Sequence, residues 1–254
     1  MPRRQEEVES YDAENYRPDT AATIEYLADL AGGGEILEFG VGTARLLLPL
    51  ASRCRSAIGV DLSADMVAAA LAADPRQSVE IHQGDMRTWT TSRRFDLIIC
   101  VFNTLLEIPS QQGQLSAVRN AASLLAPYGH LVIENLHPPL HSVAAGRRVI
   151  PLDAPGIDFG LVAQTFDWRS QMTDQRMLYV NGSRVSSRRR ALRMLFPSEQ
   201  DLMAQMGGLK LVRRMANWRG GSWHADRNGP ETSNVISVYA RAQVDGRPGN
   251  GDAA

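Results

Sequence analysis

Between residues 35 and 134, short apolar runs alternate regularly with stretches of helix-forming residues, and this alternation limits the chain to few architectures. Apolar runs of this length are typical of strands that are buried on both faces of a parallel sheet. We therefore predict an α/β fold with a doubly wound, Rossmann-like sheet covered by helices. The predicted strands are 35–39, 56–60, 79–82, 95–102 and 130–134, and the predicted helices are 20–30, 45–54, 64–73 and 114–125.

After residue 136 the pattern changes to alternating polar and apolar residues. This period is typical of antiparallel strands, which we predict at 161–169, 175–180 and 187–196, with turns at 172–174 and 181–182. We interpret 155–197 as an antiparallel insertion after the fifth strand. A helix at 198–205 and strands at 209–218 and 235–241 then complete a seven-stranded sheet. We predict a single domain over 1–242 and a disordered tail at 243–254.

Charge and apolar content exclude some classes of protein. The formal net charge is −1, so no overall attraction to nucleic acid or an anionic membrane is expected. No apolar run is long enough to span a bilayer, and we predict a cytoplasmic protein without a membrane partner. Residues 184–193 carry five arginines and no acid. We interpret this patch as a solvated strand or turn, with binding of a macromolecule as the alternative.

The strongest motif is the run from Glu38 to Ala44, with the sequence EFGVGTA, which closes the first strand and opens a helix. Its glycines allow a tight turn and close approach of a ligand to the backbone. A dinucleotide fingerprint would need a small residue five positions after Gly40, where Arg45 stands instead. The dinucleotide interpretation is therefore the weaker one.

This motif resembles the first motif of the class I S-adenosylmethionine-dependent methyltransferases, acid-x-Gly-x-Gly-x-Gly, with Ala44 in place of the third glycine. The resemblance extends from about residue 11 to 240 and implies S-adenosylmethionine as the cofactor. It implies that Asp61 accepts hydrogen bonds from the ribose hydroxyls, as an acceptor-only carboxylate can. It also places Asp85 at the adenine amino group and Glu38 at the cofactor loop or the methionine amino group.

Other cofactor contacts follow from the same resemblance: Gly40, Gly42, Leu62, Met66, Met86 and Phe102. For Met66, packing in the core is an equal alternative. Asp61 and Asp85 have an alternative as helix caps or turn residues. The segment that contains Tyr11, Tyr16 and Arg17 resembles the N-terminal arm (1–18) that covers the cofactor in small-molecule members, with Arg17 as a partner for the cofactor carboxylate. A disordered arm is the alternative.

The amino-group methyltransferases that act on nucleic-acid bases have a signature of Asn or Asp, then Pro-Pro, then an aromatic residue after the fourth strand. The chain has Asn103-Thr104-Leu105-Leu106 instead. This difference favours a small-molecule acceptor, with Phe102 and Asn103 at the methyl-transfer site. His137 follows the fifth strand and titrates near neutral pH, so it is the best candidate for a general base. A loop histidine without a role is the alternative. His141 and His224 are weaker candidates.

The sequence thus predicts a methyltransferase that modifies an oxygen or nitrogen of a small molecule in bacterial secondary metabolism. It predicts no metal and no nucleic-acid partner, and leaves a homodimer open. Two alternatives remain. One is an RNA or protein methyltransferase that uses the 184–193 patch, and the other is a non-enzymatic cofactor-binding protein.

Overall fold

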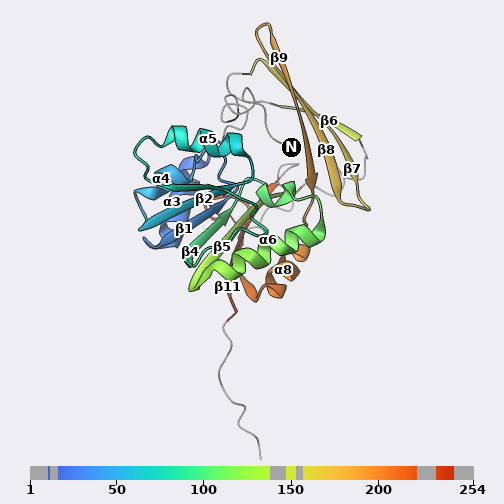
Figure 1. The fold of residues 1–254 in the computed structure, drawn as a ribbon. Helices are drawn as coiled ribbons and strands as arrows, with labels where there is room; N and C mark the ends of the chain where they lie inside the picture. The colour runs from blue at the N-terminus through green and yellow to red at the C-terminus, as the bar shows by residue number, and fades with distance from the viewer. Residues whose placement is uncertain (1–10, 12–16, 138–146, 153–156, 222–232, 243–254) are drawn as a thin grey trace, which may run out of the picture.

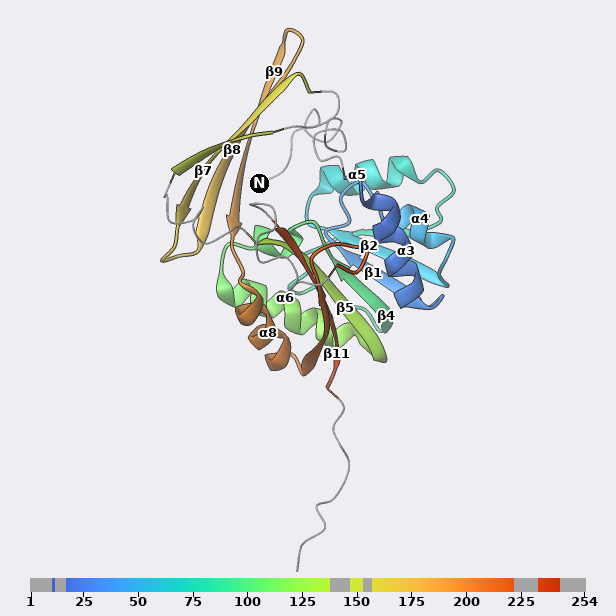
Figure 2. The same ribbon diagram turned by 180° about the vertical axis from the view of Figure 1, so that it is seen from behind.

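The computed structural model describes residues 11, 17–137, 147–152, 157–221 and 233–242. Within these residues the chain forms two sheets (Figures 1 and 2). The large sheet has seven strands in the order β10-β11-β5-β4-β1-β2-β3. Its strands are β1 (Glu35–Phe39), β2 (Ser56–Asp61), β3 (Glu80–Gln83), β4 (Phe95–Cys100), β5 (Leu125–His137), β10 (Leu209–Met215) and β11 (Ser233–Arg241).

The strand order of the large sheet fixes where a ligand can bind. β1 pairs in parallel with both β2 and β4, whereas β11 pairs antiparallel with β5 and β10. Because the chain winds from β1 to β2 and β3 on one side and to β4 and β5 on the other, the order reverses at β1. Ligands of such sheets bind outside the carboxyl ends of the strands at this switch point. The predicted fold class is confirmed.

Helices cover both faces of the large sheet (Figures 1 and 2). Neighbouring strand residues point to opposite faces, so Ile36 belongs to one apolar cluster and Leu37 to the other, and both side chains are fully buried. This double burial explains why the parallel strands are apolar throughout. The helices are α3 (Thr20–Ala31), α4 (Leu47–Ala51), α5 (Ala64–Ala73), α6 (Gln111–Leu124) and α8 (Pro197–Met206), with one 3-10 turn, η1 (Thr104–Glu107).

The second sheet is an antiparallel meander that stands apart from the helical layers (Figure 1). Its strands are β6 (Arg147–Pro151), β7 (Phe159–Asp167), β8 (Met172–Asn181) and β9 (Arg184–Arg193). The end of β9 joins the main core, because Leu192 and the following Met194 and Leu195 are buried there. The sequence did not predict β6.

The predicted turn at 172–174 is wrong, because these residues lie within β8. The chain turns at 168–171 instead. There the Asp167 carboxylate accepts hydrogen bonds from the Arg169 N–H and the Ser170 hydroxyl, as turn-forming Asp side chains do. The predicted turn at 181–182 is confirmed, with Gly182 at a φ of 58°.

Element ends differ from the prediction in ways that matter for the site. β4 ends at Cys100 rather than at 102, because residues 102 and 103 leave the extended conformation. The predicted helix at 45–54 shortens to α4, and β5 begins at Leu125. In the part of the chain that the structure describes, no helix is both long and apolar enough to cross a membrane.

Candidate active site

A pocket of about 680 Å³ opens at the carboxyl ends of the strands around the switch point. This volume lies within the range of small-molecule and cofactor sites. The loops after β1, β2, β3 and β4 all contribute to its wall. Of the residues that the sequence singled out, nine line it: Tyr11, Gly40, Gly42, Asp61, Leu62, Met66, Asp85, Met86 and Phe102.

The glycine loop after β1 is tight at Gly40 and open at Gly42. Gly40 has a φ of 71°, and a Cβ atom there would lie 2.3 Å from the Cγ2 atom of Thr104. Gly42 has a φ of 56° and no atom near its missing side chain. Because glycine adopts these angles without strain, Gly40 and Gly42 suit the backbone of this loop. The loop therefore leaves room for a ligand beside Gly42.

Asp61, at the end of β2, connects the glycine loop with the next loop. Its carboxylate accepts a hydrogen bond from the Gly42 N–H at 2.9 Å and another from the Ser63 N–H at 2.9 Å. A carboxylate can accept about four hydrogen bonds. Asp61 thus fixes the loop geometry and also lines the pocket.

Asp85, after β3, is held by Arg87. The Arg87 Nε donates to both carboxylate oxygens at 2.9 Å, and the Arg87 backbone N–H donates to Oδ1 at 2.9 Å. The hydrogen bonds from Arg87 hold the pKa of Asp85 below its ordinary value. Asp85 is therefore ionised at neutral pH and lies at the pocket wall beside Met86.

Glu38 is buried and does not line the pocket, within the residues described. Its Oε2 atom has no hydrogen-bond partner among them. Burial raises the pKa of Glu38 to about 8, against the opposing influence of Arg45. An unpartnered buried carboxyl oxygen costs free energy unless a donor reaches it. Glu38 therefore fits a site that receives a hydrogen-bond donor or a cation next to the glycine loop.

Phe102 lines the pocket after β4, and Phe102 and the following Asn103 have unusual backbone angles. Their φ values are 58° and 68°, in the left-handed region that non-glycine residues rarely adopt. The guanidinium groups of Arg17 and Arg45 lie 5.0 and 5.7 Å from the centre of the Phe102 ring. The Asn103 Oδ1 atom accepts from the Leu136 N–H, so this side chain secures the turn to β5.

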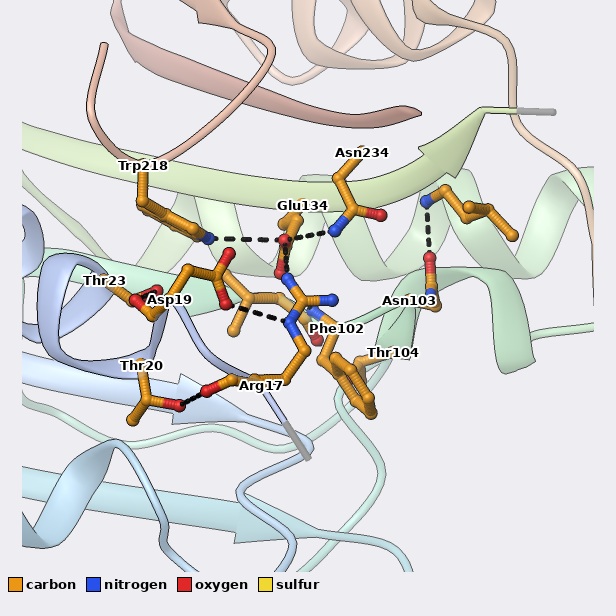
Figure 3. Close-up of polar contacts among 12 residues, drawn as sticks. Arg17, Asp19, Thr20, Thr23, Phe102, Asn103, Thr104, Glu134, Trp218 and Asn234 are labelled. Atoms are coloured by element: carbon orange, nitrogen blue, oxygen red, sulfur yellow. Dashed lines mark hydrogen bonds and ion pairs between the residues drawn. The ribbon is translucent and has the colours of Figure 1, made fainter. Parts of the chain in front are cut away.

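Glu134 on β5 is the centre of this corner of the site, and the sequence analysis did not identify it (Figure 3). It is buried, and its Oε1 atom accepts hydrogen bonds from Arg17, Trp218 and Asn234. Its Oε2 atom accepts from the Phe102 N–H at 3.0 Å. The available signal was an acid at the carboxyl end of a predicted strand, a position that Asp61 also occupies.

Arg17 lies beside Glu134 and Asp19, with which it forms ion pairs, and not among the pocket-lining residues. Burial alone would lower the pKa of Arg17, but these two acids raise it above its ordinary value. Its predicted contact with a cofactor carboxylate stays a prediction. Tyr16 lies outside the described residues.

His137 ends β5 and packs edge-on against Phe196, with 5.4 Å between the ring centres. Burial lowers the pKa of His137, so the ring is neutral at pH 7. Neither His137 nor Asn103 is among the pocket-lining residues. His141 and His224 lie outside the described residues.

The arginine patch at 184–193 is strand β9. Arg189, Arg190 and Arg193 pair with Asp174, Glu107 and Glu199, respectively. The Arg188 guanidinium lies 5.3 Å from the centre of the Tyr11 ring. Because three of these arginines are paired with acids and Arg193 is buried, the patch is not a continuous solvated basic surface.

The switch-point pocket, its glycine loop and the acids after β2 and β3 are arranged as the resemblance to the class I methyltransferases predicts. Residues 36–129 match a family model described as "Methyltransferase domain". This part of the chain is therefore similar to a methyltransferase domain, and the resemblance seen in the sequence is confirmed.

Two curated relatives come from Streptomyces. One, from Streptomyces fradiae, is a dTDP-3-amino-3,6-dideoxy-alpha-D-glucopyranose N,N-dimethyltransferase, 32% identical over 99 residues, which are 39% of this chain and 38% of the relative. The other, from Streptomyces venezuelae, is the corresponding 3,4,6-trideoxy enzyme, 28% identical over 46% of this chain and 50% of its own length. The matches thus span half or less of either relative.

Solved structures match over nearly the whole chain. The CcbJ methyltransferase from Streptomyces caelestis has a TM-score of 0.83 and 28% identity, over 93% of this chain and 96% of its own. CalS10, an amino pentose methyltransferase from Micromonospora echinaspora solved with its cofactor, has a TM-score of 0.68 and 20% identity, over 91% and 95% of the two chains. The second likeness supports the fold alone.

Proposed function

We propose that this protein transfers a methyl group from S-adenosylmethionine to a nitrogen or oxygen of a small-molecule acceptor in bacterial secondary metabolism. The observation that carries the proposal is the pocket that joins the glycine loop, Asp61 and the Asp85-Met86 pair. The methyltransferase-domain match supports the reaction class. The names of the two curated relatives support an amino group as the acceptor.

The residues present fit this cofactor. Asp61 would accept from the ribose hydroxyls, and Asp85 and Met86 would receive the adenine ring. The buried Glu38, whose Oε2 atom lacks a partner in the described chain, would receive the amino group of the methionine moiety. Tyr11 and Phe102, which line the same pocket, would cover it.

Bound S-adenosylmethionine would supply an electrophilic methyl group on a sulfonium, so the protein mainly has to align the acceptor and exclude water. Phe102 and Thr104 form the pocket wall on the β4 side, where we place the acceptor. His137 stays the proposed general base, since its lowered pKa leaves it neutral at pH 7. An acceptor amine that arrives as the free base would need little help from it.

Isothermal titration with S-adenosylhomocysteine tests the cofactor site. We expect micromolar binding by the wild type and a loss of roughly 100-fold or more in Asp61→Ala, because that change removes a charged acceptor and also the anchor of the Gly42 N–H. The control is Asp29→Ala, an exposed acid on α3 whose carboxylate pairs with Arg53. Equal affinity in the wild type and Asp61→Ala, or no binding by folded wild type, would overturn the proposal.

A further inference from the structure

Two consecutive non-glycine residues in the left-handed region make the turn after β4 a strained element. Phe102 and Asn103 have φ values of 58° and 68°. Such residues are strained and persist only where the surroundings hold them. The strain lies at the pocket, because Phe102 is part of its wall.

Hydrogen bonds to β5 hold this turn in place. The Phe102 N–H donates to the Glu134 Oε2 atom at 3.0 Å, and the Asn103 N–H donates to the Glu134 carbonyl oxygen at 3.1 Å. The Leu136 N–H donates to the Asn103 side chain. Glu134 thus contributes both its side chain and its main chain to the strained turn.

The other carboxylate oxygen of Glu134 accepts hydrogen bonds from segments that are far apart in the sequence (Figure 3). Arg17, Trp218 and Asn234 donate to Oε1, across sequence separations of 117, 84 and 100 residues. Arg17 also lies over the Phe102 ring, 5.0 Å from its centre, so it packs against a residue of the turn. The four partners of the Glu134 carboxylate, three side chains and the Phe102 backbone N–H, are all donors.

We propose that Glu134 is a positioning residue that imposes the left-handed turn at Phe102-Asn103 and couples the cofactor pocket to Arg17, Trp218 and Asn234. A glutamine at this position keeps the shape, but its amide nitrogen is a donor and must face either the Phe102 N–H or the three donors at Oε1. The turn would then lose its anchor. This inference rests on the proposed function only in the experiments that measure cofactor binding.

The experiment compares the wild type with Glu134→Gln by ¹H–¹⁵N NMR of the tryptophan indole groups during titration with S-adenosylhomocysteine. Trp218→Phe assigns the Trp218 signal by its loss. Trp89 contacts the pocket region, because its ring lies where a Cβ atom of Gly84 would be, whereas Trp168 is exposed on the second sheet. These two rings serve as the near and far controls.

In the wild type we expect the ligand to shift Trp89 and Trp218 but not Trp168. In Glu134→Gln we expect roughly 10-fold weaker binding and, at saturating ligand, a shift of Trp89 alone. A role in folding only would lower the melting temperature and leave the Trp218 response intact. A Trp218 response equal to that of the wild type, or a change in affinity of less than about 2-fold, would overturn the proposal.

A readout without ligand keeps this proposal separate from the proposed function. If the wild type binds no S-adenosylhomocysteine, hydrogen exchange of the Phe102 amide decides: we expect at least about 10-fold faster exchange in Glu134→Gln, and unchanged exchange would refute the positioning role. If Glu134→Gln does not fold, the same measurements are made on Glu134→Asp. That variant keeps the charge opposite Arg17, but its shorter side chain cannot reach both groups of donors.

Discussion

The pocket is bounded by two turns that both have positive φ angles but reach them by different means. After β1, Gly40 and Gly42 adopt these angles without a steric cost, because they have no Cβ atom. After β4, Phe102 and Asn103 adopt them against a steric cost, and Glu134 holds them there. One turn is permitted by its residue type, whereas the other is imposed by its neighbours. A substitution within the turn should therefore disrupt the turn after β1. A substitution of Glu134 should disrupt the turn after β4.

The largest effect is expected at Gly40. In Gly40→Ala the new methyl group would meet the stiff, β-branched side chain of Thr104 at a φ of 71°. Steric strain in the left-handed region and overpacking together should lower the free energy of unfolding by about 3 kcal/mol. For a chain of this size that corresponds to a fall in melting temperature of roughly 6–12 °C. Thermal unfolding followed by circular dichroism measures it.

Gly42→Ala and Gly182→Ala are matched controls, since their φ values are 56° and 58° and neither has an atom within 4 Å of the added Cβ. Both should cost about 1 kcal/mol. Only Gly42→Ala should also weaken S-adenosylhomocysteine binding, because Gly42 lines the pocket and Gly182 lies in a hairpin of the second sheet. Equal destabilisation by Gly40→Ala and Gly182→Ala would show that the contact with Thr104 is unimportant.

Much of the glycine turn after β1 could be predicted from the sequence, because its contacts are local. Asp61 bonds to residues 19 and 2 positions away, and Asp85 to a residue 2 positions away. Strand ends and short motifs therefore placed these side chains at the pocket. Glu134 has side-chain partners 32 to 117 residues away, and no local pattern specifies such pairs. The same applies to Arg17, for which the sequence suggested a cofactor role without showing the acid beside it.

The next largest expected effect on the free energy of unfolding is at Glu38, in the glycine motif. Its folded-state pKa of about 8 lies above the ordinary 4.5, so the native state binds more protons than the unfolded state between these pH values. The stability contribution of Glu38 is therefore present below about pH 4.5 and is lost as the pH rises through 8. Glu38→Gln removes this loss but still buries an amide. We expect the variant to be about 2 kcal/mol more stable than the wild type at pH 8, with the difference closing toward pH 5.

Urea unfolding at pH 5, 6.5 and 8 measures this difference. Calorimetry in two buffers with different ionisation enthalpies adds a functional readout. If the amino group of the cofactor product is received by Glu38, binding at pH 6.5 should release close to one proton from the wild type and none from Glu38→Gln. A pH-independent difference in stability would show that Glu38 is ionised in the folded protein.

The smallest effect is expected at Ala44, where the permitted turn contains one residue that is not glycine. Ala44 has a φ of 62° and is fully buried in the core. Ala44→Gly would relieve about 1–2 kcal/mol of left-handed strain, but it would lose about 0.8 kcal/mol of methyl burial and add backbone entropy to the unfolded chain. These contributions nearly cancel, so we expect a change of less than about 1 kcal/mol in unfolding free energy. A loss of 2 kcal/mol or more in urea unfolding would mean that the Ala44 methyl group is itself required, and that this turn too is partly imposed by packing.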